Sequence, residues 1–278
     1  MIGSLTLVAT PIGNLGDLSP RAVEALREAD FIAAEDTRVT LKLLNHFGIH
    51  KEMVSYYEHN ERQRGEWLLG RMLAGEHCVI VSDAGMPCIS DPGEQLVARC
   101  AEAGVPVTVI PGPSAAIAAL AVSGLSTARF AFEGFLSMNK KNRREHLRSL
   151  REDPHTLIFY EAPHKLPYTL ADLYEAFGDR RITLVRELTK LHEEIIRTTL
   201  AAALARYQAE KPRGEFVLIV EGAAPTEAPA LDLDEAVTRV LALAAAGTGL
   251  SAAAKQVARE TGHPKSELYR RALGTSDE

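Results

Sequence analysis

The sequence predicts an α/β fold made of two α/β domains followed by a small helical module. Short β-rich runs alternate with helical patterns from residue 4 onward, which is typical of parallel β-α-β units. Small and turn-forming residues gather at 123–130, which indicates a change of domain. A stretch rich in Pro, Ala and Glu at 222–232 then precedes a purely helical pattern and indicates a linker.

These breaks set the expected domain boundaries. We expect an N-terminal α/β domain over 1–123, a second α/β domain over 124–222, a linker at 223–232 and a helical module over 233–278. The length of 278 residues fits more than one domain, because one domain typically holds about 100–200 residues.

The first domain is expected to hold an open parallel sheet with helices on both faces. The runs CVIVS and PVTVI are almost continuously apolar, as expected for strands that are covered on both sides. The expected strands lie near 4–9, 30–34, 53–56, 78–82 and 106–110. The expected helices lie near 20–29, 38–46, 60–74 and 93–103, followed by one that opens at Ser114.

The second domain is expected to hold a mixed sheet. The strands at 181–186 and 194–199 are joined only by ELTKLHE, which is too short for a helical crossover, so we expect them to pair antiparallel. The expected strands lie near 130–134, 156–160, 181–186, 194–199 and 215–220.

The C-terminal module is expected to contain helices near 233–246, 251–261 and 265–273. A Gly-His-Pro turn separates the last two, a pattern that resembles a helix-turn-helix. Such pairs also occur as plain packing units, so the pattern alone leaves a nucleic-acid role open.

Composition excludes several classes of protein. Hydrophobic residues make up 46% of the chain and charged residues 24%, which excludes disorder as the dominant state. The net charge of −6 excludes general attraction to nucleic acid, so any such contact must come from a local basic patch. The three cysteines lack the spacing of a zinc site and indicate a reduced, cytoplasmic compartment.

Two apolar stretches are expected to be core rather than export or membrane segments. The N-terminal run has no basic region before it and predicts an opening strand instead of a signal peptide. The uncharged stretch 103–128 is broken by Pro111-Gly112-Pro113, which divides it into a strand and a short helix.

Three loops rich in Gly, Pro and Asp follow strands of the first domain, at 9–19, 82–93 and 111–116. Ligands of open parallel sheets bind at the carboxyl ends of the strands, where these loops lie. Tight turns alone would explain one such loop but poorly explain three. Neither a Walker A loop nor a G-x-G-x-x-G fingerprint is present, which disfavours the usual ATP and NAD sites. We therefore expect a pocket for a small zwitterion, with a helix N-terminus at Ser114 available to its carboxylate.

Eight runs follow one another in order over nearly the whole chain. They are LVATPIGNLGDLSPRAVEAL (7–26), AAEDTR (33–38), SDAGMPCISDPG (82–93), VIPGPSAAIAAL (109–120), FEGFL (132–136), FYEAPHK (159–165), RELTKLHEE (186–194) and GEFVLIVEG (214–222). Together they closely resemble the rRNA (cytidine-2′-O)-methyltransferases of the tetrapyrrole methylase superfamily.

The resemblance implies an enzyme that uses S-adenosylmethionine (SAM), held in the cleft between the two α/β domains. It further implies a homodimer without metal, and a decoding-region cytidine of 16S rRNA in the assembled small ribosomal subunit as target. The positions that match the family's cofactor contacts are Pro11, Gly13, Ala84, Gly85, Met86, Ile89, Ser114, Ala115, Glu161 and Leu188.

Methyl transfer to a ribose 2′-hydroxyl depends mainly on alignment of the two reactants, and a base can assist it. Asp36 is a candidate for accepting the proton, with Arg38 orienting it or binding a phosphate. Asp36 is an equally good candidate for capping the helix that starts at Thr37. Lys190 is a second candidate base if a nearby sulfonium lowers its pKa, although a solvated surface lysine is the ordinary alternative.

The segment 138–151 carries six basic residues against one acidic residue, a net charge of +5 in a chain of −6. A solvated helix face is the ordinary explanation, but RNA binding needs such a patch. The expected RNA contacts are Lys140, Lys141, Arg143 and Arg144 in this segment, and Lys265, Arg270 and Arg271 in the last helix.

Two other functions fit parts of the pattern. A small-molecule methylase acting on a tetrapyrrole would share the fold but would not need the basic segment or the helical module. A non-catalytic ribosome-binding protein would not need the three loops.

Overall fold

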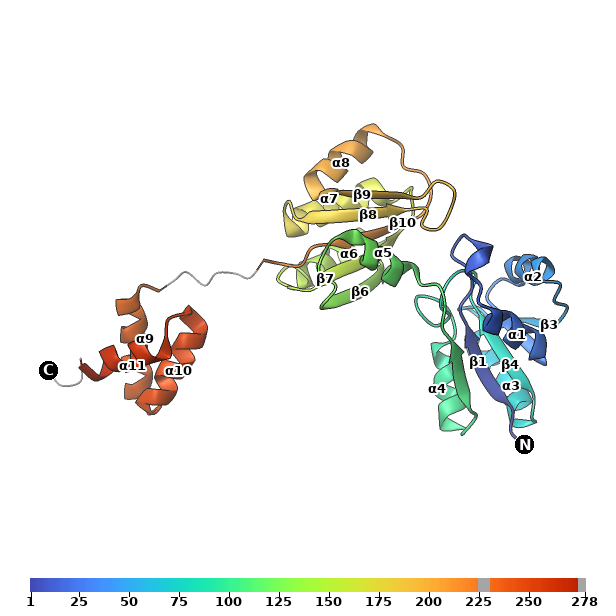
Figure 1. Ribbon diagram of the computed structural model, residues 1–278, viewed down its shortest axis with the longest axis horizontal. Coiled ribbons are helices and arrows are strands. Elements are labelled where there is room, and N and C mark those ends of the chain that lie inside the picture. Colours follow the sequence, from blue (N-terminus) through green and yellow to red (C-terminus); the bar gives the residue numbers. More distant parts are fainter. Residues whose placement is uncertain (225–230, 275–278) are drawn as a thin grey trace. The chain divides into compact units, whose positions relative to one another are not determined.

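The computed structural model of the protein describes residues 1–224 and 231–274, which form two compact units, Met1–Ala223 and Ala224–Glu278. Among the described residues, the first unit contains two sheets of five strands each, and the second contains three helices (Figure 1). The predicted linker at 223–232 lies largely outside the described residues.

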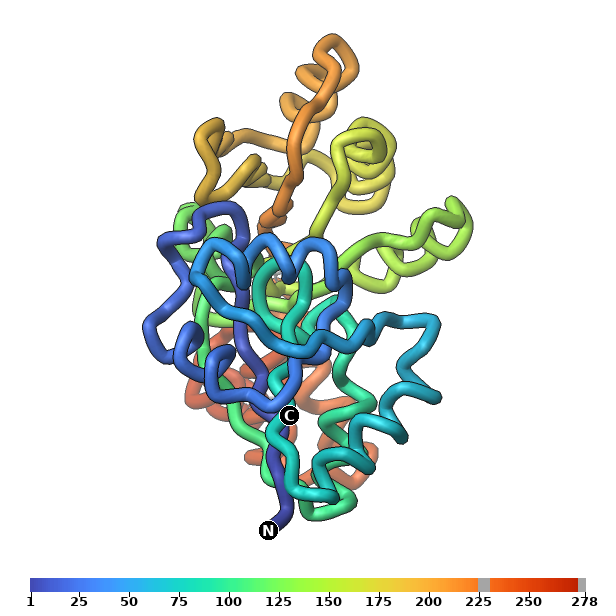
Figure 2. Tube along the Cα trace, turned by 90° about the vertical axis from the view of Figure 1, so that its right-hand side faces the viewer, coloured from blue at the N-terminus to red at the C-terminus, as the bar shows by residue number. Residues whose placement is uncertain are grey.

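The first sheet is parallel throughout and is covered by helices on both faces. Its strands are β1 (Ser4–Val8), β2 (Phe31–Ala34), β3 (Glu52–Ser55), β4 (His77–Val81) and β5 (Val107–Ile110), and its helices are α1 (Pro20–Glu28), α2 (Thr37–His46), α3 (Glu61–Leu73) and α4 (Glu94–Glu102). The strand order is β3-β2-β4-β1-β5. Helices α1 and α2 lie on one face of the sheet and α3 and α4 on the other (Figure 2). The first pair buries Leu26 and Leu44 against the sheet, and the second pair buries Leu68 and Leu96. The predicted elements are confirmed, with ends that differ by one or two residues.

The second sheet is mixed. Its strands are β6 (Phe130–Phe135), β7 (Thr156–Glu161), β8 (Arg181–Arg186), β9 (Glu194–Thr199) and β10 (Phe216–Val220), in the order β6-β7-β10-β8-β9. Only β6 and β7 pair in parallel, and the expected antiparallel pairing of β8 with β9 is confirmed by a register that joins Arg181 to Thr199. One face carries α6 (Lys140–Ser149), α7 (Leu166–Phe177) and α8 (Leu200–Ala209).

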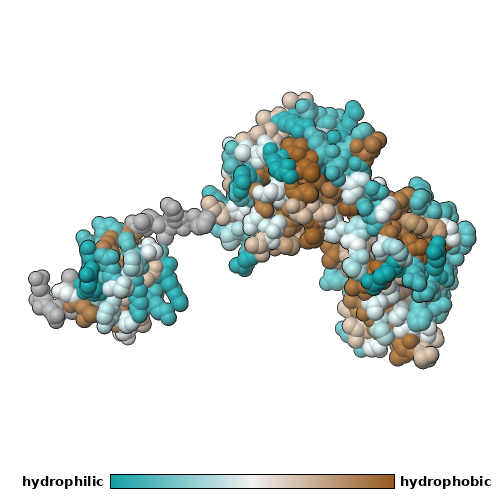
Figure 3. Space-filling model, viewed as in Figure 1, coloured by the Kyte–Doolittle hydropathy of each residue, from teal (hydrophilic) through white to brown (hydrophobic). Residues whose placement is uncertain are grey.

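The other face of the second sheet carries α5 (Ala115–Ser123). This helix follows β5 of the first sheet, yet Ala119 and Leu120 are buried against Ile158 and Ile219 of the second. Its outward side is apolar as well, with Ile117 51% exposed, and Figure 3 shows hydrophobic surface over this part of the first unit. By sequence, helix α5 therefore lies in the first predicted domain, but it packs in the core of the second. The domain boundary at 123/124 stays a prediction.

The second unit has a core of its own. Its helices are α9 (Leu233–Ala245), α10 (Leu250–Thr261) and α11 (Lys265–Gly274), which match the predicted ranges closely. Val240, Val257 and Leu268 are fully buried among them. Asp232 caps α9 by accepting the amide of Asp234, and Gly262 ends α10 in the left-handed conformation that favours glycine. Across both described ranges, none of the helices has the length and apolar character that crossing a membrane requires.

Two arginines of the basic segment hold α6 on α7. Arg143 Nε donates to Asp172 Oδ2 at 2.7 Å, and Arg144 Nε donates to Asp172 Oδ1 at 2.9 Å. Asp172 is 5% exposed, so this buried carboxylate is paired with two guanidinium groups at once. Arg144 also pairs with Glu175, which is exposed to solvent.

Removal of the shared carboxylate is expected to destabilise this unit. Asp172→Ala leaves two guanidinium groups without their buried partner, and we expect a loss of about 3 kcal/mol in the free energy of unfolding. The control Glu175→Ala removes a solvent-exposed partner of Arg144 and should cost less than about 1 kcal/mol. Denaturant unfolding of the two variants checks this, and equal losses would contradict a structural role for Asp172.

Candidate functional site

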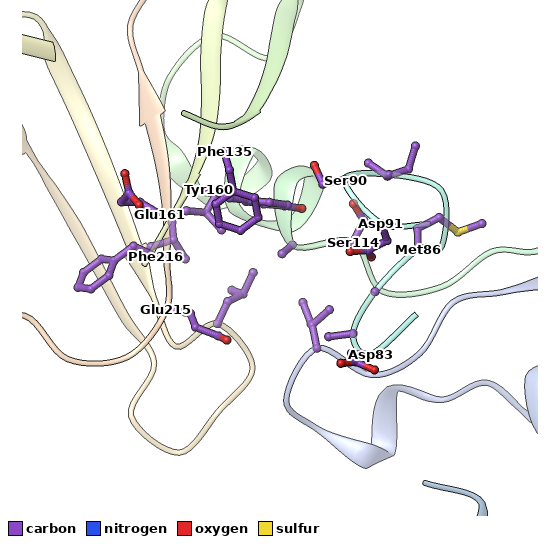
Figure 4. A pocket seen from close by; sticks show the side chains of 18 of the residues that line it. Asp83, Met86, Ser90, Asp91, Ser114, Phe135, Tyr160, Glu161, Glu215 and Phe216 are labelled. Atoms are coloured by element: carbon purple, nitrogen blue, oxygen red, sulfur yellow. The ribbon is translucent and has the colours of Figure 1, made fainter. Parts of the chain in front are cut away.

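A cavity of about 350 Å³ lies in the first unit, between loops of its two sheets (Figure 4). Figure 4 shows Asp83, Met86 and Asp91 on one side, facing Tyr160 and Glu215 on the other. Eight of the ten predicted cofactor contacts line the cavity, namely Ala84, Gly85, Met86, Ile89, Ser114, Ala115, Glu161 and Leu188. The other two, Pro11 and Gly13, do not line it, although Ile12 between them does.

The loops that line the cavity are tied to one another. Thr10 and Gly85 exchange two backbone hydrogen bonds of 2.9 and 3.0 Å, which join the first loop to the second. Gly13, at φ +145°, lies so close to the β8–β9 loop that a Cβ atom would be 2.5 Å from Lys190 Cγ. The hydroxyl of Tyr160 accepts the amide of Ala116 at 3.1 Å and joins β7 to the start of α5. These contacts hold together the parts of the cavity that come from the two sheets.

Backbone strain is concentrated in the same loops. Within the described part of the chain, the non-glycine residues with positive φ are Cys88, Ser90, Glu187 and Thr189. The first two lie in the loop after β4 and the other two in the loop between β8 and β9, and both loops line the cavity. Strain of this kind persists only where the surrounding structure imposes it, and it clusters at functional sites.

Three carboxylates on one side of the cavity have raised pKa values. Burial, together with the negative charge of Glu35, raises the pKa of Asp91 to about 6. Burial also raises the pKa of Glu35 and of Asp83, and each is further raised by a neighbouring acid. Groups with such shifts in a cavity are candidates for proton transfer. The sequence contained these residues in the runs AAEDTR and SDAGMPCISDPG, but their burial could not be read from it.

Asp36 and Arg38 do not line the cavity. Asp36 caps α2 by accepting the amide of Arg38 at 2.8 Å, so the capping alternative is confirmed. Its carboxylate also accepts three side-chain hydrogen bonds from Arg38, and these lower its pKa to about 2. A carboxyl with this pKa is a poor proton acceptor at neutral pH.

Lys190 lines the cavity, and its ammonium group is held by two carboxylates. It donates to Glu187 Oε1 at 3.0 Å and to Glu215 Oε2 at 2.8 Å. Burial alone would lower the pKa of Lys190, but the two carboxylates outweigh it and raise that pKa above its usual value. The pKa shift is thus opposite to the one expected for a base, and Lys190 carries a proton at neutral pH.

The cavity is negatively charged. Lys190 is opposed by six carboxylates in the lining, namely Glu35, Asp83, Asp91, Glu161, Glu187 and Glu215. Such a cavity attracts a cationic ligand and repels phosphate groups.

The seven predicted RNA contacts divide into two groups. Arg143 and Arg144 bind Asp172, and the two arginines of α11 pair with Glu267 and Asp234. Lys140, Lys141 and Lys265 are exposed, and among the described residues no ion-pair partner lies near their ammonium groups. The lysines are therefore better placed than the arginines to meet a new anion.

The fold and the cavity agree with a comparison of the chain with known protein families. The model of the tetrapyrrole (corrin/porphyrin) methylases matches residues 4–204, so the chain belongs to that family of methylases. The model of the RsmI C-terminal HTH domain matches residues 232–276, which include all three helices of the second unit.

Relatives narrow the class further. A ribosomal RNA small subunit methyltransferase I from Synechocystis sp. is 49% identical over 273 residues, which cover 98% of each chain. A protein of the same name from Thermotoga maritima is 45% identical over 221 residues, which cover 80% of this chain and 99% of the relative. Within the methylases, the chain belongs to the ribosomal RNA small subunit methyltransferase I family.

A solved structure confirms the fold. The uroporphyrin-III C-methyltransferase of Thermus thermophilus, in complex with S-adenosylhomocysteine, has a TM-score of 0.56 and 22% identity. The match covers 78% of this chain and 97% of that chain.

The raised pKa of Asp91 predicts a pH-dependent stability. The unfolded chain releases this proton near the ordinary pKa of about 4, whereas the folded protein holds it until about pH 6. Between these values the unfolded state binds fewer protons, so the free energy of unfolding falls as the pH rises. We expect Asp91→Asn to raise the midpoint of thermal unfolding at pH 8 and to leave it nearly unchanged at pH 4.

Thermal unfolding of parent and variant across this pH range checks the prediction. Asp17→Asn, at an exposed aspartate, is the control and should show no such trend. A stability difference between Asp91→Asn and the parent that does not change with pH would contradict it.

Proposed function

We propose that this protein transfers a methyl group from SAM to the 2′-hydroxyl of a decoding-region cytidine in 16S rRNA of the small ribosomal subunit. The observation that carries the proposal is the lining of the cavity, which combines eight positions matched to cofactor contacts with an excess of carboxylates. The names of the relatives support the substrate class.

The cavity fits SAM in size and charge. Its volume of about 350 Å³ lies in the range of small-molecule sites, roughly 300–1,000 Å³. The loop at 82–91 and the start of α5 would hold the molecule, and SAM supplies an electrophilic methyl group on a sulfonium cation. The surrounding carboxylates compensate that positive charge.

In this reaction the residues of the cavity would orient the reactants and accept the proton of the ribose hydroxyl. The tied loops orient the reacting groups, which accounts for most of the rate in a displacement of this kind. Asp91, which lines the cavity, is the most suitable proton acceptor, because a carboxyl with a pKa of about 6 is largely ionised at neutral pH and is more basic than an ordinary aspartate. Asp36 and Lys190 serve this role less well, one because of its low pKa and the other because it is already protonated.

A tetrapyrrole substrate is the alternative for this fold. The likeness to a uroporphyrin methyltransferase concerns the fold alone, whereas the helical second unit matches an RsmI domain. The rRNA substrate therefore has the stronger support.

The proposed substrate implies a cytoplasmic protein, and the family resemblance implies a homodimer. An apolar groove of about 360 Å³ supports self-association, since it is lined by Val109 of β5, Ile117 of α5 and Phe130 of β6. Each of these side chains is more than two-fifths exposed in the single chain.

The function is tested by mapping ribose methylation in small subunits incubated with the protein and SAM. We expect a single new 2′-O-methylcytidine in the decoding region.

Ala115→Trp places an indole in the cavity and should weaken SAM binding at least about tenfold, a loss of at least about 1.4 kcal/mol, measured by calorimetry. Ala121→Trp, at an exposed site of the same helix, is the matched control. Methylation of another molecule class, or full SAM affinity in a folded Ala115→Trp variant, would contradict the proposal.

The helical unit is proposed to dock the substrate rather than to take part in methyl transfer. Deletion of residues 224–278 removes no strand of either sheet and leaves the cavity intact. The Thermotoga maritima relative, which has almost no sequence beyond its 221 matched residues, supports a methylase unit that stands alone.

We expect the truncated protein to fold and to bind SAM as the parent does. Its KM for small subunits should rise at least about tenfold while kcat changes little, because lost docking weakens binding without altering the site. Steady-state kinetics on purified subunits checks this. If the truncated protein lost SAM binding, the helices would be part of the methylase core. If its KM for small subunits were unchanged, the helices would have no role in docking.

A further inference from the structure

A second cavity, of about 210 Å³, lies beside the first. It is formed by the segment between β6 and α6 and by the start of α7, and the side chain of Glu161 lines both cavities. The run FYEAPHK, whose last three residues have no role in the site described so far, crosses from one cavity to the other: Glu161 faces both, and Lys165 lines only the second.

Glu161 forms a fixed partition between the cavities. Its side chain is 4% exposed, Oε1 accepts the amide of Ala162 at 2.8 Å, and Oε2 accepts the hydroxyl of Thr169 at 2.5 Å. The two cavities therefore share this carboxylate as a wall, and a strand of substrate seated in the second cavity would lie next to the first.

The two cavities differ in charge. The first has six carboxylates against one lysine, which makes it unsuitable for phosphate groups. The second has Arg143 and Lys165 against Glu161. Arg143 is already balanced by Asp172 and donates to the carbonyl of Ser137 at 3.1 Å. Lys165, by contrast, has no ion pair or side-chain hydrogen bond with any residue in the described ranges.

An aromatic ring lies next to this lysine. Tyr168, one turn further along α7, lines the second cavity and is 70% exposed. Within the described residues no other ring stacks on it. An exposed ring beside a free cation is the combination that binds single-stranded RNA, because the ring stacks on a base and the cation neutralises a phosphate.

We propose that the second cavity is the subsite for the RNA strand next to the target nucleotide. Lys165 Nζ pairs with a backbone phosphate, and the ring of Tyr168 stacks on a neighbouring base. This inference rests on the proposed function and adds to it the direction from which the strand reaches the methyl-transfer cavity. The exposed Lys140 and Lys141, which follow the same segment in sequence, extend the cationic surface.

The test uses the full-length protein and a fluorescein-labelled oligocytidine, with binding followed by fluorescence anisotropy over a range of salt concentrations. Lys165→Ala should weaken binding about tenfold and reduce the slope of log K against log salt by about 0.7, the contribution of one phosphate contact on a single strand. Tyr168→Ala should weaken binding at least about fivefold without changing that slope, because stacking carries no charge.

Three control variants separate the subsite from general effects. Lys165→Arg keeps the charge and should retain the salt slope. Lys42→Ala removes an exposed lysine of α2, and Tyr174→Ala removes an exposed ring of α7 outside the cavity, so both should bind oligocytidine as the parent does. SAM affinity, measured by calorimetry, should be unchanged in every variant, which also shows that each is folded.

A second readout distinguishes the failure of this inference from the failure of the proposed function. With small subunits as substrate, Lys165→Ala and Tyr168→Ala should raise KM more than they lower kcat. If the parent methylates subunits and both variants keep its KM and its salt slope, the subsite is overturned and the function stands. If the parent neither binds oligocytidine nor methylates subunits, both are overturned.

Discussion

The packing of α5 is the constraint on which the candidate site depends. The helix leaves β5 of the first sheet, lines the cavity with Ala115, and is buried along Ala119 and Leu120 against the second sheet. Its two ends are anchored to that sheet: the amide of Ala116 donates to Tyr160, and the carbonyl of Ser123 accepts the hydroxyl of Thr183 at 2.8 Å. Because its residues are mostly alanine, the helix approaches the strands closely, so the loops of the first sheet are brought against those of the second.

This arrangement stores free energy in the cavity. Non-glycine residues with positive φ cost about 1–3 kcal/mol each, and the cavity loops hold four of them among the described residues. Burial of the clustered carboxylates, with their mutual repulsion added to it, raises the pKa of Asp91 to about 6. A cationic ligand would offset that repulsion, so the carboxylates favour binding of a ligand of the proposed charge.

The sequence predicted the elements well and the tertiary electrostatics poorly, for a physical reason. Periodicity and turn residues are local, and they placed every strand of both sheets within two residues of its observed ends. Helix α5 is apolar on all sides, so its pattern carried no direction and could not show which sheet it covers. The pKa of a side chain depends on partners that are distant in sequence. The pKa of Asp91 is raised by burial and by Glu35, and the pKa of Lys190 is raised in part by Glu215. Neither the burial nor these two distant partners can be read from the local sequence.

The same reasoning explains how a chain of net charge −6 can meet RNA. The segment 138–151 carries +5 in sequence, but Arg143 and Arg144 hold α6 on α7, so Lys140, Lys141 and Arg148 are the exposed charges of this segment without an ion pair among the described residues. Lys165 adds one more beside the methyl-transfer cavity, and Lys265 another in the helical unit. Each such contact is weak alone. When several are carried on one chain, however, the first contact raises the effective concentration of the others, and the overall affinity for RNA increases. On the proposed function, the protein needs no strongly basic surface. A few lysines without ion pairs among the described residues would position the strand, while the acidic cavity would take the cationic cofactor.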